Sequence, residues 1–172
     1  MCFLKMHYSE VIQRDMILTE VIENVSVLSN PKKIILSFGG ENYEECYVLS
    51  CIFSLYFLCG QKPYITRQNI QGFSDGEVMG GKLTLRGLSM YNFLYRLLFE
   101  ILPSMKYFEG FRAPGHQNIY SFTIKDIFAF EGLGSLFSYL DLLGSIQCQV
   151  HFTTKNNKEV ITLAQNLFFC FY

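Results

Sequence analysis

Strict alternation of apolar and polar side chains is the feature that most restricts how this chain can fold. In the stretch KLTLRG, the side chains of Lys82, Thr84 and Arg86 alternate with those of Leu83 and Leu85. Successive side chains of a β-strand point to opposite faces of the sheet, so this stretch predicts a half-buried strand with one polar face. The same alternation occurs over residues 33–38, 119–125 and 146–153.

The polar positions of these four predicted strands hold hydrogen-bonding side chains without carboxylates. They are occupied mainly by Lys, Arg, Ser, Thr, Gln and His, and by no Asp or Glu. Because the phosphate and sugar oxygens of nucleic acids accept hydrogen bonds, a sheet face of this composition suits RNA. We therefore expect this face to be open to a partner.

The order of the predicted elements indicates the fold class. Helical patterns cover residues 5–23, 41–59 and 88–102 and begin again at 156, and a short strand lies within GQKPYITRQ. Residues 126–145 are an irregular apolar stretch with room for a short helix around residues 137–143. This order predicts an α+β fold, with a mainly antiparallel sheet, helices packed on one face and the other face open for RNA. Residues 46–58 are apolar nearly all round, so we expect that helix to be enclosed by the sheet and its neighbours.

Length and glycine content indicate the domain organisation. With 172 residues, half of them apolar, the chain fits a single domain over residues 1–172. Residues 69–81 are polar and contain four glycines, and the next strand is expected to begin at Lys82. We expect an exposed loop at residues 68–81, and long loops in compact domains are usually functional.

The charge is unevenly distributed. The net charge of −1 does not by itself indicate a nucleic-acid-binding protein. However, residues 61–112 hold seven Lys or Arg against four Asp or Glu, whereas residues 1–60 hold four against seven. Four of the central cations, Lys62, Arg67, Lys82 and Arg86, lie on segments that flank the predicted loop, which favours binding of phosphates there.

No motif in the sequence indicates an enzyme. Residues 76–82 read GEVMGGK, formally a phosphate-binding loop, but Leu83 follows in place of the required Ser or Thr and a strand replaces the helix. The three histidines are far apart, and the six cysteines form no CxxC pair. We expect buried free thiols, no catalytic residues, no metal site and no cofactor.

The sequence also lacks the signals of membrane insertion and export. The longest uncharged run, residues 46–59, would reach only about 21 Å as a helix, less than the roughly 30 Å hydrocarbon layer. The amino terminus resembles neither a secretory signal nor an Arg-rich transit peptide. We expect no membrane contact and a protein that either works where it is made or has had its presequence removed.

Several motifs resemble the universal large-subunit ribosomal protein five family. They are GQKPYITR, GGKLTLRG followed by MYNFLYRL, NVSVLSNPKKIILSFGG and GHQNIYSF. The resemblance implies a non-enzymatic constituent of the large ribosomal subunit that binds 5S rRNA in the central protuberance through its open sheet face. It further implies that the loop between the second and third strands contacts P-site tRNA. The other implied partners are neighbouring large-subunit proteins and a small-subunit head protein across a bridge.

The candidate site residues combine the polar face, the central cations and positions carried over from the family. The polar trio implied to contact 5S rRNA is Ser37, Gln61 and Thr84. With the basic residues, the predicted rRNA-binding set is Lys33, Ser37, Gln61, Lys62, Thr84, Lys82 and Arg86. The predicted tRNA loop comprises Arg67, Gln68, Asn69, Gln71, Gly72, Phe73, Gly76, Gly80 and Gly81.

Two departures from the family pattern point to an organellar ribosome. Ser37 replaces the family's usual asparagine, and the loop holds Asp75 and Glu77 in place of further basic residues. Seventeen Phe and eleven Tyr suggest an AT-rich genome. We expect a protein of the mitochondrial matrix, encoded in the organelle. The alternative is a protein-interaction module of an organellar ribosome without 5S rRNA, where it contacts protein or large-subunit rRNA instead.

Overall fold

The computed structural model of the chain describes residues 2–19, 24, 28–39, 45–67, 76, 78–106, 108–112, 118–130, 132–140, 142–154 and 157–171. Its strands are β1 (Asn30–Gly39), β2 (Tyr64–Arg67), β3 (Val78–Leu85), β4 (Ile119–Ile124) and β5 (Ile146–Thr153). Its α-helices are α1 (Phe3–His7), α2 (Gln13–Thr19), α3 (Glu45–Cys59), α4 (Gly87–Tyr95), α5 (Leu102–Ser104), α6 (Phe137–Leu140) and α7 (Asn157–Asn166). The π-helical turns Tyr8–Ile12 and Arg96–Ile101 continue α1 and α4.

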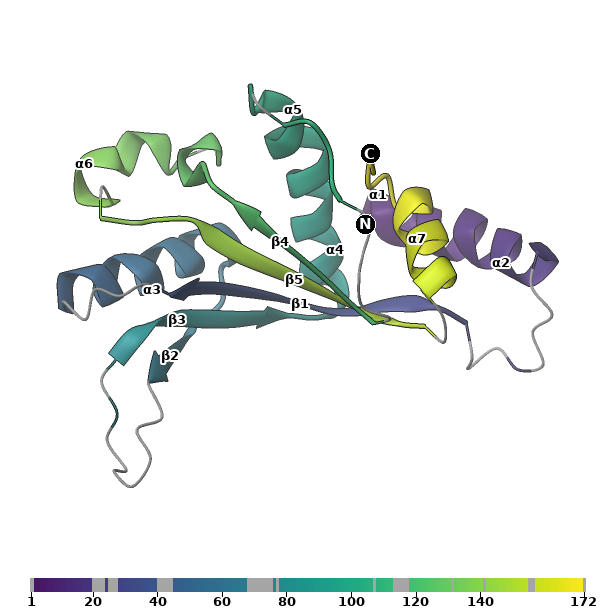
Figure 1. Cartoon of the computed structure of the whole chain (residues 1–172), viewed down its shortest axis with the longest axis horizontal. Coiled ribbons are helices and arrows are strands. Elements are labelled where there is room, and N and C mark those ends of the chain that lie inside the picture. The colour runs from purple at the N-terminus through teal and green to yellow at the C-terminus, as the bar shows by residue number, and fades with distance from the viewer. Residues whose placement is uncertain are drawn as a thin grey trace. The chain divides into compact units, whose positions relative to one another are not determined.

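The described strands form one five-stranded antiparallel sheet in the order β2-β3-β1-β5-β4 (Figure 1). This arrangement confirms the predicted α+β fold. β2 and β3 pair with Tyr64 opposite Lys82 and Thr66 opposite Gly80, and a bulge separates Thr66 from Arg67.

The chain divides into two compact units. The terminal unit comprises Met1–Ile34, Arg86–Phe122 and Gln149–Tyr172, and the central unit comprises Ile35–Leu85 and Thr123–Cys148. A single domain over residues 1–172 stays a prediction.

In the central unit, β3 and α3 approach each other closely at a pair of glycines. A Cβ atom on Gly81 would lie 3.1 Å from the Leu55 Cδ1 atom, and Leu55 is fully buried. A Cβ atom on Gly80 would collide with the backbone carbonyl of Phe38 in β1. Both glycines belong to β3, which begins at Val78 and not at Lys82, so the predicted strand start is wrong by four residues.

Within the part of the chain that the structure describes, α3 is covered on one side and exposed on the other, so the prediction that it is enclosed is wrong. Its buried side includes Tyr47, Cys51 and Leu55. On the other side, Phe53 and Leu49 are 46% and 67% exposed. A helix that is apolar all round carries no periodicity to indicate which side the sheet will cover.

In the terminal unit, α1 packs against α4. Leu4 and Leu94 are fully buried, and the Tyr8 hydroxyl donates a 2.9 Å hydrogen bond to the Ser29 carbonyl. The predicted helix over residues 5–23 begins at Phe3, contains a π-helical turn and extends to Thr19, while residues 20–23 lie outside the described residues.

The end of α7 is closed by a residue in the left-handed region. Phe168 has φ 69°, and the Phe169 amide donates a 2.9 Å hydrogen bond to the Ala164 carbonyl. The Phe168 ring lies 5.0 Å from the His7 ring and 5.4 Å from the Phe99 ring, measured between centroids. This bond pattern is that of a Schellman helix end, which normally uses glycine.

The predicted irregular stretch of residues 126–145 consists of short turns in its described parts. The Asp126 carboxylate accepts a 3.1 Å hydrogen bond from the Phe128 amide and so begins the 3-10 turn Ile127–Ala129. A second 3-10 turn, Gly134–Leu136, leads into α6.

Candidate nucleic-acid interface

The alternation predicted from the sequence separates two faces of the sheet in the central unit. Leu36, Leu83 and Cys148 are buried. Ser37 and Thr84 are half-buried, and Lys82 and Gln147 are exposed. We use the name polar face for the side that carries Ser37, Thr66, Lys82, Thr84, Thr123 and Gln147.

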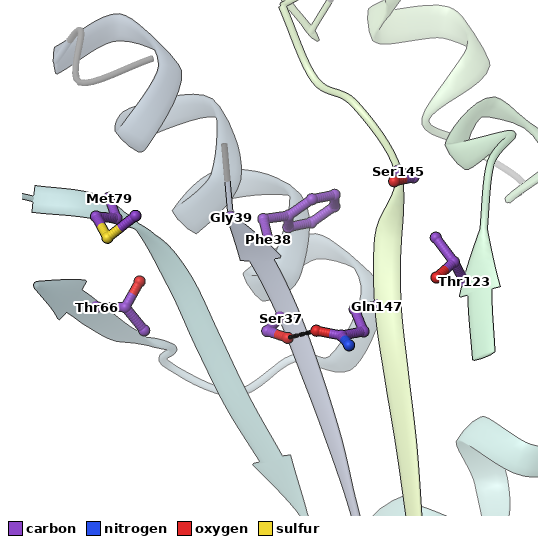
Figure 2. Close-up of a pocket in the computed structure, with 8 residues that line it drawn as sticks. All are labelled: Ser37, Phe38, Gly39, Thr66, Met79, Thr123, Ser145 and Gln147. Atoms are coloured by element: carbon purple, nitrogen blue, oxygen red, sulfur yellow. Dashed lines mark hydrogen bonds between the residues drawn. The ribbon is translucent and has the colours of Figure 1, made fainter. Parts of the chain in front are cut away.

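The polar face is hollowed where all five strands contribute side chains or backbone. The hollow has a volume of about 390 Å³. Figure 2 shows the residues that line it, which are Ser37, Phe38, Gly39, Thr66, Met79, Thr123, Ser145 and Gln147. None of these eight described residues carries a charge, and their polar side chains offer hydroxyl and amide groups.

One hydrogen bond crosses this hollow. The Ser37 hydroxyl lies 3.5 Å from the Gln147 Oε1 atom, to which it donates (Figure 2). This distance is beyond the usual range for hydrogen bonds between oxygens, so the bond is weak. Ser37, a predicted rRNA contact, thus shares a site with Gln147, which the predicted set omitted.

A cation and an aromatic ring lie side by side at the β2–β3 edge of the sheet. Tyr64 is directly opposite Lys82 in the antiparallel ladder and is 77% exposed. Lys82 is exposed as well. Directly opposite side chains in such a ladder are neighbours on one face, so Tyr64 belongs beside the predicted rRNA contact Lys82.

The remaining predicted contacts of the central unit lie around β2. Gln61 is half-buried and Lys62 is exposed in the link between α3 and β2. Arg67, the last residue of β2, is exposed and pairs with Val78. The structure therefore places the cations Lys62 and Arg67 at the two ends of this short strand.

Two predicted rRNA contacts belong to the terminal unit. Lys33 is half-buried in β1. Arg86 is exposed and takes the N-cap position of α4 with an extended backbone, without a side-chain capping bond. Both side chains therefore reach solvent, as the alternation predicts.

The predicted tRNA loop is described only at its ends. Gly76 is half-buried, whereas Gly80 and Gly81 are buried inside β3. The placement of Gly80 and Gly81 in an exposed loop is wrong, because the tight contacts of β3 with β1 and α3 require glycine there. The other predicted loop residues lie outside the described residues, namely Gln68, Asn69, Gln71, Gly72 and Phe73.

Sequence reasoning missed Tyr64, Thr66, Thr123, Ser145 and Gln147 as members of the site. The signal that could have identified Thr123 and Gln147 was the alternation itself, which places both on the polar side of their strands. Tyr64 and Thr66 required the register between β2 and β3, which a strand of four residues does not reveal.

The six cysteines are free, but they are not all buried as predicted. Cys2, Cys51 and Cys148 are buried, whereas Cys46 and Cys170 are exposed. Burial raises the pKa of the Cys51 thiol to about 11 and also raises the pKa of Cys148. Among the described residues, no group of three or more His, Cys, Asp or Glu could hold a metal ion.

Within the same part of the chain, none of the helices has both the length and the apolar character needed to span a bilayer.

Comparisons with known proteins identify the family. A family model described as the C-terminus of the ribosomal L5 family matches residues 78–171. The chain is 32% identical to the large ribosomal subunit protein uL5 of Borreliella afzelii, over 91% of this chain and 89% of that protein. It is 31% identical to uL5 of Variovorax paradoxus over 99% of both chains. It is 29% identical to the large ribosomal subunit protein uL5m of Reclinomonas americana, over 91% of this chain and 90% of that protein.

The family model and the relatives together cover the whole sheet. The match to the model begins at Val78, the first residue of β3, so it includes β3, β4 and β5 but neither β1 nor β2. The relatives extend the similarity towards the amino terminus, because each of the three covers at least 91% of the chain. The chain therefore belongs to the ribosomal L5 family, a family of structural ribosomal proteins and not of enzymes.

Proposed function

We propose that this chain is a constituent of the large ribosomal subunit that binds 5S rRNA through the polar face. The observation that carries the proposal is the composition of the strands. β1, β2, β3, β4 and β5 contain Lys32, Lys33, Arg67 and Lys82, and none of them contains an Asp or Glu. A sheet with cations and hydroxyls but no carboxylates attracts the RNA backbone without local repulsion.

The proposed contact set keeps the predicted rRNA-binding residues. Lys62 and Lys82 are exposed, so they can pair with phosphates, and Ser37 and Thr84 are half-buried, so they can bind sugar or base groups. Family membership supports the choice of rRNA, and 5S rRNA in the central protuberance follows from the resemblance in the motifs.

Binding of 5S rRNA should be tested with the purified full chain. We expect binding that weakens steeply as KCl rises, because each neutralised phosphate contributes a slope of about −0.9 in a plot of log affinity against log salt. An unrelated structured RNA of equal length serves as the specificity control. Absent or salt-insensitive binding, for 5S rRNA and for large-subunit rRNA alike, would contradict the proposal.

Contacts with P-site tRNA, neighbouring large-subunit proteins and the small-subunit head are the finer part of the proposal. The tRNA contact is assigned to the segment that begins with the exposed Arg67 and leads into β3. A density map of the native particle tests it, since we expect this segment at the elbow of the tRNA. A map with the segment directed away from the tRNA would overturn this assignment.

We further propose that the ribosome is mitochondrial and that the chain is encoded in the organelle. The similarity to a protein named uL5m and the abundance of Phe and Tyr support this location. The test is mass spectrometry of purified mitochondrial ribosomes after labelling with cytosolic translation blocked. We expect the protein to be present in the large subunit and to carry the label. Absence of the protein would contradict the mitochondrial location, and presence of unlabelled protein would contradict its encoding in the organelle.

A second candidate function is supported by the uncovered side of α3. Leu49, Phe53 and Tyr56 are exposed on this helix, and it contains no Lys or Arg. An apolar stripe without cations suits a protein better than RNA, as expected for an interaction module in a ribosome without 5S rRNA.

Substitution of Leu49 and Phe53 by Ser tests this candidate. If the chain is held mainly by protein contacts, the double variant should be lost from the assembled large subunit while its rRNA affinity is unchanged. Lys82→Gln is the matched variant, because it should reduce rRNA affinity and leave protein contacts intact. Full assembly of the double variant would contradict this second function.

A further inference from the structure

We propose that the hollow in the polar face is a site for one unpaired nucleotide of ribosomal RNA, bound through its neutral base and ribose and not through its phosphate. This inference rests on the proposed RNA-binding function and adds the part of the RNA that this site recognises. Of the implied trio, Ser37 lines the hollow, and the other hydrogen-bonding residues of the site are Thr66, Thr123, Ser145 and Gln147.

The chemistry of the lining selects the ligand. The side chains that can hydrogen-bond in the hollow are the hydroxyls of Ser37, Thr66, Thr123 and Ser145 and the amide of Gln147. Hydroxyls and amides both donate and accept, which matches base edges and ribose hydroxyls. A phosphate site would instead present Lys, Arg or a set of backbone amides, and none of the lining residues that the structure describes is charged.

These groups are available for a ligand. Thr123, Ser145 and Gln147 are exposed, and Thr66 is half-buried. Within the described part of the chain, the bond from Ser37 is the one side-chain hydrogen bond made by these five residues, and its 3.5 Å length makes it easy to exchange. The amide nitrogen of Gln147 and three hydroxyls can therefore contact RNA without breaking a strong internal bond.

The size and lining of the hollow suit a nucleotide base better than the RNA backbone. Its volume of about 390 Å³ lies at the lower end of the range for small-molecule pockets. Met79 contributes a half-buried thioether from β3, and sulfur makes favourable contacts with aromatic rings. Sequence-specific recognition of RNA usually targets unpaired bases, because paired bases are hidden in the narrow major groove of an A-form helix.

Because the described lining is neutral, the loss of a contact in the hollow can be distinguished experimentally from the loss of a contact made by a cation. Removing a neutral hydrogen bond lowers RNA affinity without changing the number of counterions released. Removing Lys82 reduces both the affinity and the salt slope. The slope therefore reports which kind of contact has been lost.

The experiment measures affinity of the full chain for a 5S rRNA transcript, and in parallel for large-subunit rRNA, over a series of KCl concentrations. We expect Thr123→Val and Gln147→Leu each to reduce affinity roughly two- to ten-fold, the effect of one lost hydrogen bond, with an unchanged salt slope. Thr162→Val and Gln165→Leu make the same chemical changes at exposed positions of α7, which belongs to no strand of the proposed RNA-binding face. We expect these controls to bind like the unchanged protein.

Chemical probing of the RNA supplies a second readout. In the complex, one unpaired nucleotide should be protected at its base edge and its 2′-hydroxyl. This protection should disappear with Thr123→Val and Gln147→Leu combined and persist with Lys82→Gln.

Each other outcome overturns the inference in a recognisable way. Unchanged affinity of the neutral variants would show that the hollow binds no nucleotide, while the proposed RNA-binding function survives. A reduced salt slope in these variants would identify a phosphate ligand instead. Failure of the unchanged protein to bind either RNA would overturn the proposed function as well.

Discussion

Tyr64 and Lys82 lie directly opposite each other across the β2–β3 ladder, with both side chains exposed. The pair places an aromatic ring beside an ammonium group on a face whose strands carry no carboxylate. An ammonium group on such a face is available for a phosphate, and the ring adds apolar area on which a base can stack.

Substitution Lys82→Gln should reduce both the affinity for rRNA and its salt dependence. Because one phosphate contact is lost, the slope of log affinity against log salt should become shallower by about 0.9, the value for a duplex. Lys5→Gln, at an exposed position of α1 in the terminal unit, is the control. An unchanged slope for Lys82→Gln would exclude Lys82 from the interface.

Substitution Gly80→Ala should destabilise the fold. The new methyl group would meet the Phe38 carbonyl, which is held in β1 and cannot rotate away, so we expect a loss of about 3 kcal/mol in urea unfolding. Gly144→Ala is the matched control, because no atom lies within 4 Å of its Cβ position. Equal stability of the two variants would contradict the close approach of β3 to β1.

Because Phe168 has a left-handed backbone, we expect glycine to be more stable than alanine at this position, the reverse of the order inside a helix. Both Phe168→Gly and Phe168→Ala remove the ring, but only Ala keeps a Cβ atom at φ 69°, so the Gly variant should be more stable by about 1 kcal/mol. At the exposed position Asn92 within α4, the order should reverse, with Ala more stable by a similar amount. Thermal unfolding of the four variants tests both signs.

The thiols should differ in reactivity. Iodoacetamide should modify the exposed Cys46 and Cys170 first and the buried Cys51 and Cys148 only on unfolding, as mass spectrometry would reveal. Early modification of Cys51 in the folded protein would contradict its burial between α3 and the sheet.

The thiol of Cys51 should also make stability depend on alkaline pH. Burial raises the pKa of Cys51 from 9.0 to about 11, so the folded state favours the neutral thiol. Its contribution to stability is complete below pH 9 and is lost as the pH rises towards 11. In urea unfolding over this range, Cys51→Ala should therefore lose less stability than the unchanged protein, whereas Cys46→Ala should follow the unchanged protein.

Alternation along the strands made the sheet and its polar face predictable from the sequence. It placed Ser37, Lys82 and Thr84 where they reach solvent, because a period of two fixes side-chain direction whatever the neighbouring strands are. The motifs around GQKP and LRG indicated the family for a separate reason, since they are similarities of sequence and not consequences of packing.

The features that the sequence did not reveal depend on contacts between distant segments. Gly80 and Gly81 suggest a loop when taken locally, and only the approach of Phe38 and Leu55 explains them as parts of a strand. The hollow depends on strand order, which brings Thr66 of β2 and Thr123 of β4 to the same site from opposite edges of the sheet.

The two glycines of β3 also have a consequence for strand alignment. If β3 slipped by one residue against its neighbours, a side chain from Met79 or Lys82 would be forced into a space that admits only hydrogen atoms. The same slip would turn the Lys82 ammonium inward among leucines. Gly80 and Gly81 therefore fix the alignment of β3, because a shift that turned Lys82 away from the polar face would also disrupt the packing of β3 against β1 and α3.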